Sequence, residues 1–135
     1  MKNRAHLFHR SLFLILICTL TFPFCNKLFA QEKTQMVRLA KLVIDSTQLE
    51  NYKAFLREEI ETSIRLEPGV KTLYAVSEKD RPTHFTILEI YADTAAYKSH
   101  ILTAHFLKYK NGTQHMVKSL ELVETVPLVP GMKIK

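Results

Sequence analysis

The sequence predicts an α+β domain in which four strands and two helices follow one another in the order βαββαβ. Three observations predict it: an apolar run typical of a covered strand near residue 40, a helical repeat of apolar residues after it, and a further hairpin, helix and strand toward the C-terminus. The 135 residues suffice for one such domain. With 47% apolar and 24% charged residues the composition is that of a globular protein, so we expect the chain to fold.

The first strand and the first helix carry the clearest signals. Residues Met36–Ile44, MVRLAKLVI, are apolar at nearly every position, as in a strand covered on both faces. Thr47-x-x-Glu50 then has the pattern of a capping box. Apolar residues recur after it at helical spacing: Leu49, Tyr52, Phe55, Leu56, Ile60 and Ile64. Pro68-Gly69 ends this helix.

A hairpin and a second helix and strand follow. Val70–Val76 and His84–Ala92 are β-rich, and the polar segment between them, residues 78–82, is a turn. Asp93 is a good N-cap for a helix that begins at Thr94 and loosens toward residues 111 and 112. Val117–Val126 is the last strand, before a tail whose prolines cannot continue a sheet. This order is the ferredoxin-like unit, in which two helices cover one face of an antiparallel sheet.

Alternation along the third strand divides its side chains between the two faces of the sheet. The set that suits the helix side is Thr86, Leu88 and Ile90. The other set is Phe85, Ile87, Glu89 and Tyr91. Its mixture of rings and a carboxylate suits a partly polar cavity. Pairing two such sheets would hide the large apolar residues of that face, so we expect a homodimer, a dimeric α+β barrel.

The first thirty residues have the order of a secretory signal peptide. A basic start precedes an apolar run from residue 12 to about residue 24, and small Ala30 offers a cleavage site. The run is short and broken by Pro23, which argues against an uncleaved anchor. We expect residues 1–30 to be removed and residues 31–135 to be exported, to the periplasm, with membrane contact only during export. Lipid attachment at Cys25 is disfavoured because bulky Phe24 precedes it.

Removal of the signal peptide would also remove most of the excess positive charge. The chain has 19 Lys and Arg against 13 Asp and Glu. Four of the basic residues lie in the first thirty, which leaves 15 against 13 and a net charge of +2. No basic cluster remains, so binding to nucleic acid is not expected. Both cysteines, Cys18 and Cys25, lie there too, which excludes disulfides and cysteine chemistry in the remaining domain.

The segment from Leu88 to Phe106 carries a family resemblance. It reads LEIYAD-x-x-AY-x-x-H-x-x-T-x-HF, and it resembles the hallmark segment of the antibiotic biosynthesis monooxygenase family. The segment Glu67-Pro68-Gly69-Val70 is similar to the family's usual junction between helix and strand. The resemblance covers about residues 36–127 and implies the fold. It says less about the reaction, because one fold hosts many chemistries.

The family includes cofactor-independent monooxygenases of small quinols and polyketide-like phenols, haem-degrading enzymes, and an isomerase of phosphorylated autoinducer-2. The haem branch has a tryptophan where Tyr91 stands and a histidine ligand where Lys110 stands. The polyketide branch uses tryptophan in its pocket, and this chain has no tryptophan. In the segment His-x-x-Thr-x-His-Phe, residues 100–106, the chain resembles the small quinol monooxygenases and the isomerase most, which implies chemistry without a cofactor.

His100 and His105 are the first candidates for catalysis. A histidine can take or give a proton near neutral pH, and both cofactor-free oxygenation and keto–enol isomerisation require a phenol or enol to be deprotonated. The alternatives are structural: a hydrogen-bonded seam for His100 and a turn cap for His105. Two histidines five residues apart fit a metal site on one helix poorly, since such sites prefer a spacing of four, so no metal is predicted.

Tyr91 is the third catalytic candidate, because a tyrosine hydroxyl can orient a substrate oxygen. Glu89 shares its face and is either a buried base or the partner of a cation across the sheet, with Arg38 and Lys41 as candidates. The residues expected to bind substrate are Tyr74, Glu89, Phe85, Phe106 and Arg38. For Tyr74, a core position is the alternative.

Together these features favour an exported, cofactor-independent monooxygenase of a small quinol or phenol. In this hypothesis His100 or His105 removes a proton, and the resulting anion reacts with molecular oxygen. The alternatives are an isomerase of a small dicarbonyl compound and a non-catalytic dimer that binds small apolar molecules.

Overall fold

The computed structural model describes residues 34–129, so the predicted signal peptide and the end of the C-terminal tail lie outside the described residues. The elements are β1 (Met36–Ile44), α1 (Leu49–Leu66), β2 (Val70–Ser77), β3 (His84–Tyr91), α2 (Thr94–His100), α3 (Ala104–Thr113) and β4 (Val117–Thr125). Short 3-10 turns at Ser46–Gln48 and Gln114–Met116 precede α1 and β4. The predicted α+β, ferredoxin-like βαββαβ fold is confirmed, with its second helix in two pieces.

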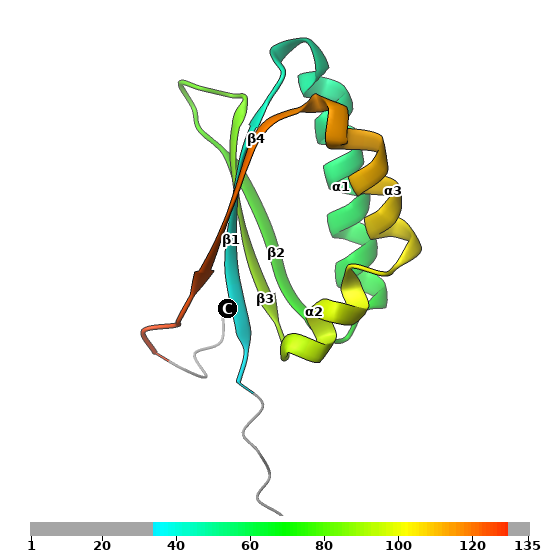
Figure 1. The fold of residues 1–135 in the computed structure, drawn as a ribbon, viewed down its shortest axis with the longest axis vertical. Helices are drawn as coiled ribbons and strands as arrows, with labels where there is room; N and C mark the ends of the chain where they lie inside the picture. Colours follow the sequence, from blue (N-terminus) through cyan, green and yellow to red (C-terminus); the bar gives the residue numbers. More distant parts are fainter. Residues whose placement is uncertain (1–33, 130–135) are drawn as a thin grey trace, which may run out of the picture. The chain divides into compact units, whose positions relative to one another are not determined.

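The four strands form one antiparallel sheet in the order β2-β3-β1-β4. All three helices lie on the same side of it, with α1 and α3 side by side (Figure 1). Strand β1 pairs with both β3 and β4, and its residues are alternately buried toward the helices and half-buried on the open face, apart from exposed Lys41. Within residues 34–129, the helices are too short or too polar to span a membrane.

The assignment of the two sheet faces from sequence is wrong, although the alternation itself is right. Phe85 and Ile87 lie in the core beneath α1, where the rings of Phe85 and Tyr52 meet edge to face at 5.3 Å. Glu89 and Tyr91 continue this face toward α2. The set Thr86, Leu88 and Ile90 consequently lies on the open face. The error arose because the layer between helices and sheet is not uniformly apolar and contains a polar cluster at one end.

Helix α1 begins without the predicted capping box. The side chain of Asp45 accepts hydrogen bonds from the backbone N–H and the hydroxyl of Thr47, at 2.8 and 2.6 Å, and starts the 3-10 turn that leads into the helix. Gln48 occupies the N-cap position of α1 and makes no capping bond with its side chain. The charged carboxylate is a strong acceptor for the Thr47 hydroxyl, which is therefore not available to cap α1.

The second predicted helix is broken after His100. Helix α2 ends there, and α3 begins at Ala104 with Thr103 as its N-cap, whose hydroxyl accepts from the N–H of Phe106 at 3.4 Å. The same hydroxyl donates to the carbonyl oxygen of His100 at 2.7 Å. These bonds stabilise a turn where the sequence predicted one continuous helix, and the turn changes the direction of His105 relative to His100.

Gly112 allows α3 to approach α1 closely. A Cβ atom at this position would lie 2.5 Å from a ring carbon of Phe55. We expect Gly112→Ala to lower the free energy of unfolding by about 1–3 kcal/mol, the usual cost of overpacking, despite the better helix propensity of alanine. Urea unfolding should show this loss, whereas Asn111→Ala, at an exposed position of the same helix, should change little. A Gly112→Ala protein more stable than wild type would contradict the close packing.

Candidate active site

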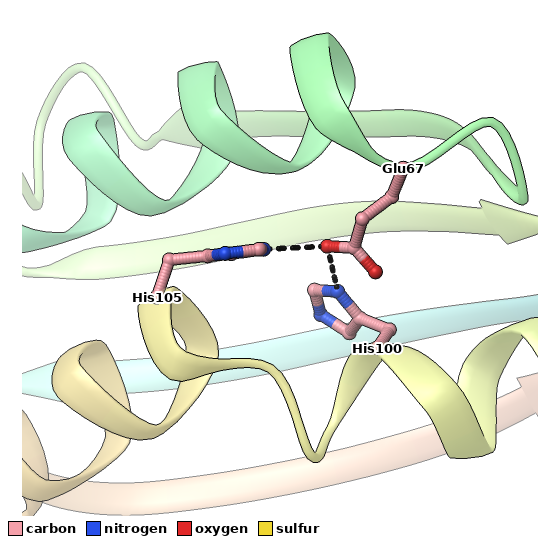
Figure 2. Close-up of side chains that lie close together, drawn as sticks. All are labelled: Glu67, His100 and His105. Atoms are coloured by element: carbon pink, nitrogen blue, oxygen red, sulfur yellow. Dashed lines mark hydrogen bonds and ion pairs between the residues drawn. The ribbon is translucent and has the colours of Figure 1, made fainter.

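Glu67, His100 and His105 meet at one end of the helical layer (Figure 2). Glu67 directly follows α1, His100 is the last residue of α2, and His105 lies in the first turn of α3. One oxygen of Glu67, Oε1, is 3.0 Å from Nδ1 of His100 and 2.6 Å from Nε2 of His105. The break between α2 and α3 lets both rings point toward this oxygen. The two predicted histidines thus come together around a shared carboxylate.

The two histidines differ in their access to solvent. His100 is 2% exposed and packs against the rings of Tyr91 and Phe106, with centroids 5.4 and 4.9 Å away. The side chain of His105 is 16% exposed. Its Nε2 also lies 3.1 Å from the Thr103 hydroxyl, and its Nδ1 makes no hydrogen bond within residues 34–129. His105 is therefore partly open to solvent and its Nδ1 is not engaged, whereas a small molecule could not reach His100 without a rearrangement.

Glu67 carries the negative charge of the cluster. Burial opposes its ionisation, but the hydrogen bonds from His100 and His105 outweigh that effect and lower the pKa of Glu67 below its ordinary value. Glu59 on α1 is the reverse case, because burial raises the pKa of Glu59 more than the Ser63 hydroxyl, 2.8 Å away, and His100 lower it. At neutral pH, Glu67 can therefore act as an anion that stabilises an imidazolium.

Tyr91 and Glu89 lie beside this cluster. The Tyr91 hydroxyl donates to Oε2 of Glu89 at 3.2 Å, and burial, together with that carboxylate, raises the pKa of Tyr91 above its ordinary value. Tyr91 thus stays a neutral hydroxyl group that is not suited to removing a proton, and at 1% exposed it is as far from solvent as His100. Burial also raises the pKa of Glu89, against the opposing effects of Tyr91 and Arg38.

The raised pKa of Glu89 predicts how replacing it with a neutral residue changes the pH dependence of stability. Between the unfolded and folded pKa of this group the unfolded chain releases the proton first, so Glu89 makes the protein less stable as the pH rises. Glu89→Gln mimics the protonated form, and we expect its stability relative to wild type to increase between pH 4 and pH 8. Urea unfolding across that range is the measurement. A relative stability that falls with rising pH would show that Glu89 is held as a carboxylate.

Arg38 is the cation across the sheet from Glu89. It is buried, pairs in register with Glu89 and Glu124, and places its guanidinium 4.4 Å from the centre of the Tyr97 ring. It also contacts the carboxylate of exposed Glu124, at 3.5 Å. The Nε atom of Arg38 has no hydrogen-bond partner in the described part of the chain. Lys41, the other candidate cation, instead lies 3.5 Å from Glu121.

The remaining predicted residues lie in three different places. Phe106 contacts His100 and forms part of the wall of the cluster. Phe85 is a core residue packed on Tyr52. Tyr74 is 65% exposed and lies on the open face of the sheet, on the opposite side from the helices. Within one chain, Tyr74 and the two histidines are therefore separated by the sheet.

Sequence reasoning missed Glu59 and Ser63 and noted Glu67 only as part of a junction. A charged residue on a helix is expected to face solvent, but Glu59 is 5% exposed, and Ser63 is fully buried. A signal was available, because Tyr52, Leu56, Glu59 and Ser63 follow one another at intervals of four, three and four residues, which is one helical face. A carboxylate on a buried helical face predicts a polar partner opposite it.

Glu67, His100 and His105 also have the donor types of a metal site, and their donor atoms all lie within 4.8 Å of one another. The sequence argument against a metal assumed that both histidines sit on one continuous helix, and the break after His100 removes that premise. In the structure, Oε1 of Glu67 is hydrogen-bonded to both rings. A chelator control therefore belongs in any assay of this cluster.

Comparison with known proteins places the chain in a family. Residues 36–112 match the model of the antibiotic biosynthesis monooxygenase family. A candidate antibiotic biosynthesis monooxygenase from Bacteroides thetaiotaomicron has a solved structure that is 62% identical over 77% of this chain and 99% of its own, with a TM-score of 0.75. A candidate monooxygenase from Lactobacillus acidophilus is 29% identical over 70% of this chain and 45% of its own, with a TM-score of 0.68.

A candidate antibiotic biosynthesis monooxygenase from Nitrosomonas europaea is 25% identical over 71% of this chain and 92% of its own, with a TM-score of 0.66. The search of curated proteins gave no match. The family match covers more than half of the 135 residues. On this evidence the chain belongs to the antibiotic biosynthesis monooxygenase family.

Proposed function

We propose that the protein is a cofactor-independent monooxygenase of a small quinol or phenol, with His105 as its general base. The observation that carries the proposal is the pair of His105 and Glu67: an imidazole with access to solvent, 2.6 Å from a carboxylate whose pKa is lowered. A base held by a fixed carboxylate is the arrangement that proton removal requires. The family, and the names of its relatives, favour oxygenation as the use of that proton transfer.

The proposed reaction begins when a quinol hydroxyl gives its proton to Nδ1 of His105. Glu67 stabilises the imidazolium, and the quinolate, an electron-rich anion, transfers electrons to molecular oxygen. One oxygen atom bonds to a ring carbon. When the O–O bond breaks, the other oxygen leaves as water, which takes one proton from His105 and the second from the oxygenated ring carbon. Quinol and oxygen thus give hydroxyquinone and water. The quinol supplies all four electrons, so the reaction needs no external reductant.

The test is oxygen uptake by the purified protein, in the presence of EDTA, with a panel of small quinols. We expect uptake of one oxygen molecule per quinol. Uptake that is lost in EDTA and restored by a metal ion would contradict the cofactor-free part of the proposal. A folded protein that takes up no oxygen with any quinol would contradict oxygenation and favour an isomerase of a small dicarbonyl compound or a binding protein.

We also propose that the protein is a homodimer joined through the open face of the sheet. Tyr74 and Val76 on this face are 65% and 46% exposed. Tyr74 pairs with Leu88 on β3, which in turn pairs with Leu39 on β1. An exposed apolar face of this kind favours association, and a second copy of the same sheet is a self-complementary partner. The proposed interface is the face opposite to the one expected from sequence, because Phe85 and Tyr91 point toward the helices.

Tyr74→Arg should weaken the dimer at least about tenfold in its dissociation constant, because a charge would be buried at the interface. The fold of the single chain should survive, since the side chain is exposed in it. Leu102→Arg, at a 74% exposed position between α2 and α3, is the control and should leave the dimer unchanged. Light scattering over a concentration series measures both. A monomeric wild type, or a Tyr74→Arg protein that stays fully dimeric, would refute this interface.

A further inference from the structure

His100 lies between two carboxyl groups and has no access to solvent. Its Nδ1 is 3.0 Å from Oε1 of Glu67, and its Nε2 is 3.6 Å from Oε1 of Glu59. His100 and Glu59 are 2% and 5% exposed. A neutral imidazole has one N–H group, so it cannot serve as a donor to both carboxyl groups at once. The positions of the protons on His100, Glu59 and Glu67 therefore depend on one another.

Two arrangements give each ring nitrogen of His100 an attractive partner. In the first, Glu59 is protonated and faces the lone pair of Nε2, while the N–H at Nδ1 donates to Glu67. In the second, His100 is an imidazolium between two carboxylates. Both contain the same number of protons. A neutral His100 with its hydrogen on Nε2 is unfavourable, because the lone pair of Nδ1 would then face the Glu67 anion at 3.0 Å.

The surroundings of Glu59 favour the first arrangement. Oε1 of Glu67 is stabilised as an anion by two rings, whereas Glu59 is buried on α1 with the hydroxyl of Ser63 as its hydrogen-bond donor. The titratable groups that interact with Glu59 are two imidazoles, two further carboxyl groups and three tyrosine hydroxyls: His100, His105, Glu67, Glu89, Tyr52, Tyr91 and Tyr109. The two histidines favour a charged Glu59, but burial outweighs them and raises its pKa, and the carboxyl groups of Glu67 and Glu89 act in the same direction as burial.

We propose that Glu59, in its protonated form, is a positioning residue for the base. It holds His100 in the tautomer with its hydrogen on Nδ1, and His100 in turn holds the carboxylate of Glu67 toward His105. The chain of contacts runs from Ser63 through Glu59, His100 and Glu67 to His105. This inference rests on the proposed function, because it describes how the proposed base is held.

The direct test is the tautomer of His100, measured by long-range proton–nitrogen NMR on histidine-labelled protein. The full chain is expressed so that any N-terminal processing takes place, and His100→Gln identifies the signal. At neutral pH we expect a protonated Nδ1 and an unprotonated Nε2. Glu59→Gln should preserve this tautomer, because its amide N–H can replace the carboxylic O–H opposite Nε2. Protonation of both ring nitrogens, or of Nε2 alone, would overturn the inference.

The NMR result does not depend on turnover, so its failure is distinct from a failure of the oxygenase proposal. Turnover adds a second readout. We expect Glu59→Gln to retain kcat within about threefold, and Glu59→Ala to lose about 10- to 100-fold in kcat with little change in KM, because the base is then held less well. Equal losses in both variants would show that Glu59 does not act as a neutral donor. If Glu59→Ala fails to fold, the tautomer in Glu59→Gln still decides the question.

Discussion

Replacing His105 with alanine is expected to lower kcat for quinol oxidation by about 10²–10⁴-fold, the usual contribution of a general base. Of the two histidines that contact Glu67, only His105 has a ring that solvent can reach. In this variant the proton acceptors near the quinol are water and Glu67, which is a weak base because its pKa is lowered. KM should change less than kcat, because the proposed contact of His105 with substrate matters most during proton transfer. Steady-state oxygen uptake measures both constants.

His115→Ala is the matched control for this substitution. His115 is exposed in the turn between α3 and β4 and is separate from the Glu67 cluster, so its removal should leave kcat unchanged. Circular dichroism should show that both variants are folded, since His105 is not part of either hydrophobic core cluster. A His105→Ala protein with the kcat of wild type would exclude His105 as the base.

Glu67→Gln should have an effect of similar size on kcat, about 10²–10⁴-fold, because the variant keeps the shape of the side chain and removes the charge that stabilises the imidazolium. The substitution also affects stability. The pKa of Glu67 is lowered by folding, so Glu67 contributes stability above its unfolded pKa, and that contribution is lost as the pH falls through the folded pKa. Glu67→Gln should therefore be less stable than wild type at neutral pH, and the free energies of unfolding of the two proteins should become similar in acid.

Glu61→Gln, at an exposed position of α1, removes the same charge outside the cluster and should change neither kcat nor the pH dependence of unfolding. Urea unfolding at pH 4 and pH 7, combined with oxygen uptake, compares the two variants. A Glu67→Gln protein that keeps its activity would mean that His105 works without an anion beside it.

Local signals were sufficient to predict most of the fold. The bounds of β1 follow from its unbroken apolar run, and α2 begins at Thr94 because Asp93 caps it with a bond of 2.8 Å to the N–H of Ala96. The polar turn after Val76 produces the hairpin of β2 and β3. Each of these features depends on residues close together in the chain, and such residues can be recognised in the sequence by their periodicity or as helix caps.

The site could be predicted only in part, because it depends on contacts between distant segments. The sequence indicated His100 and His105 as candidates, but not that Glu67 joins them, since 33 and 38 residues separate it from the two rings. The break after His100 was missed because Thr103 can either continue a helix or cap a new one. The sequence did not indicate Glu59 as part of the site because a carboxylate on a helix is usually solvated. The predicted signal peptide lies outside the described residues, and export stays a prediction.

The most direct test of the central claim, that the protein is a monooxygenase, is the fate of isotopically labelled oxygen. The purified protein, with EDTA present, would be given a quinol that it consumes, under an atmosphere of ¹⁸O₂, and the product analysed by mass spectrometry. We predict one labelled oxygen atom in the hydroxyquinone and the other in water, with incorporation lost in His105→Ala. A product without label, whether a quinone formed with hydrogen peroxide or an isomer of the substrate, would contradict monooxygenation.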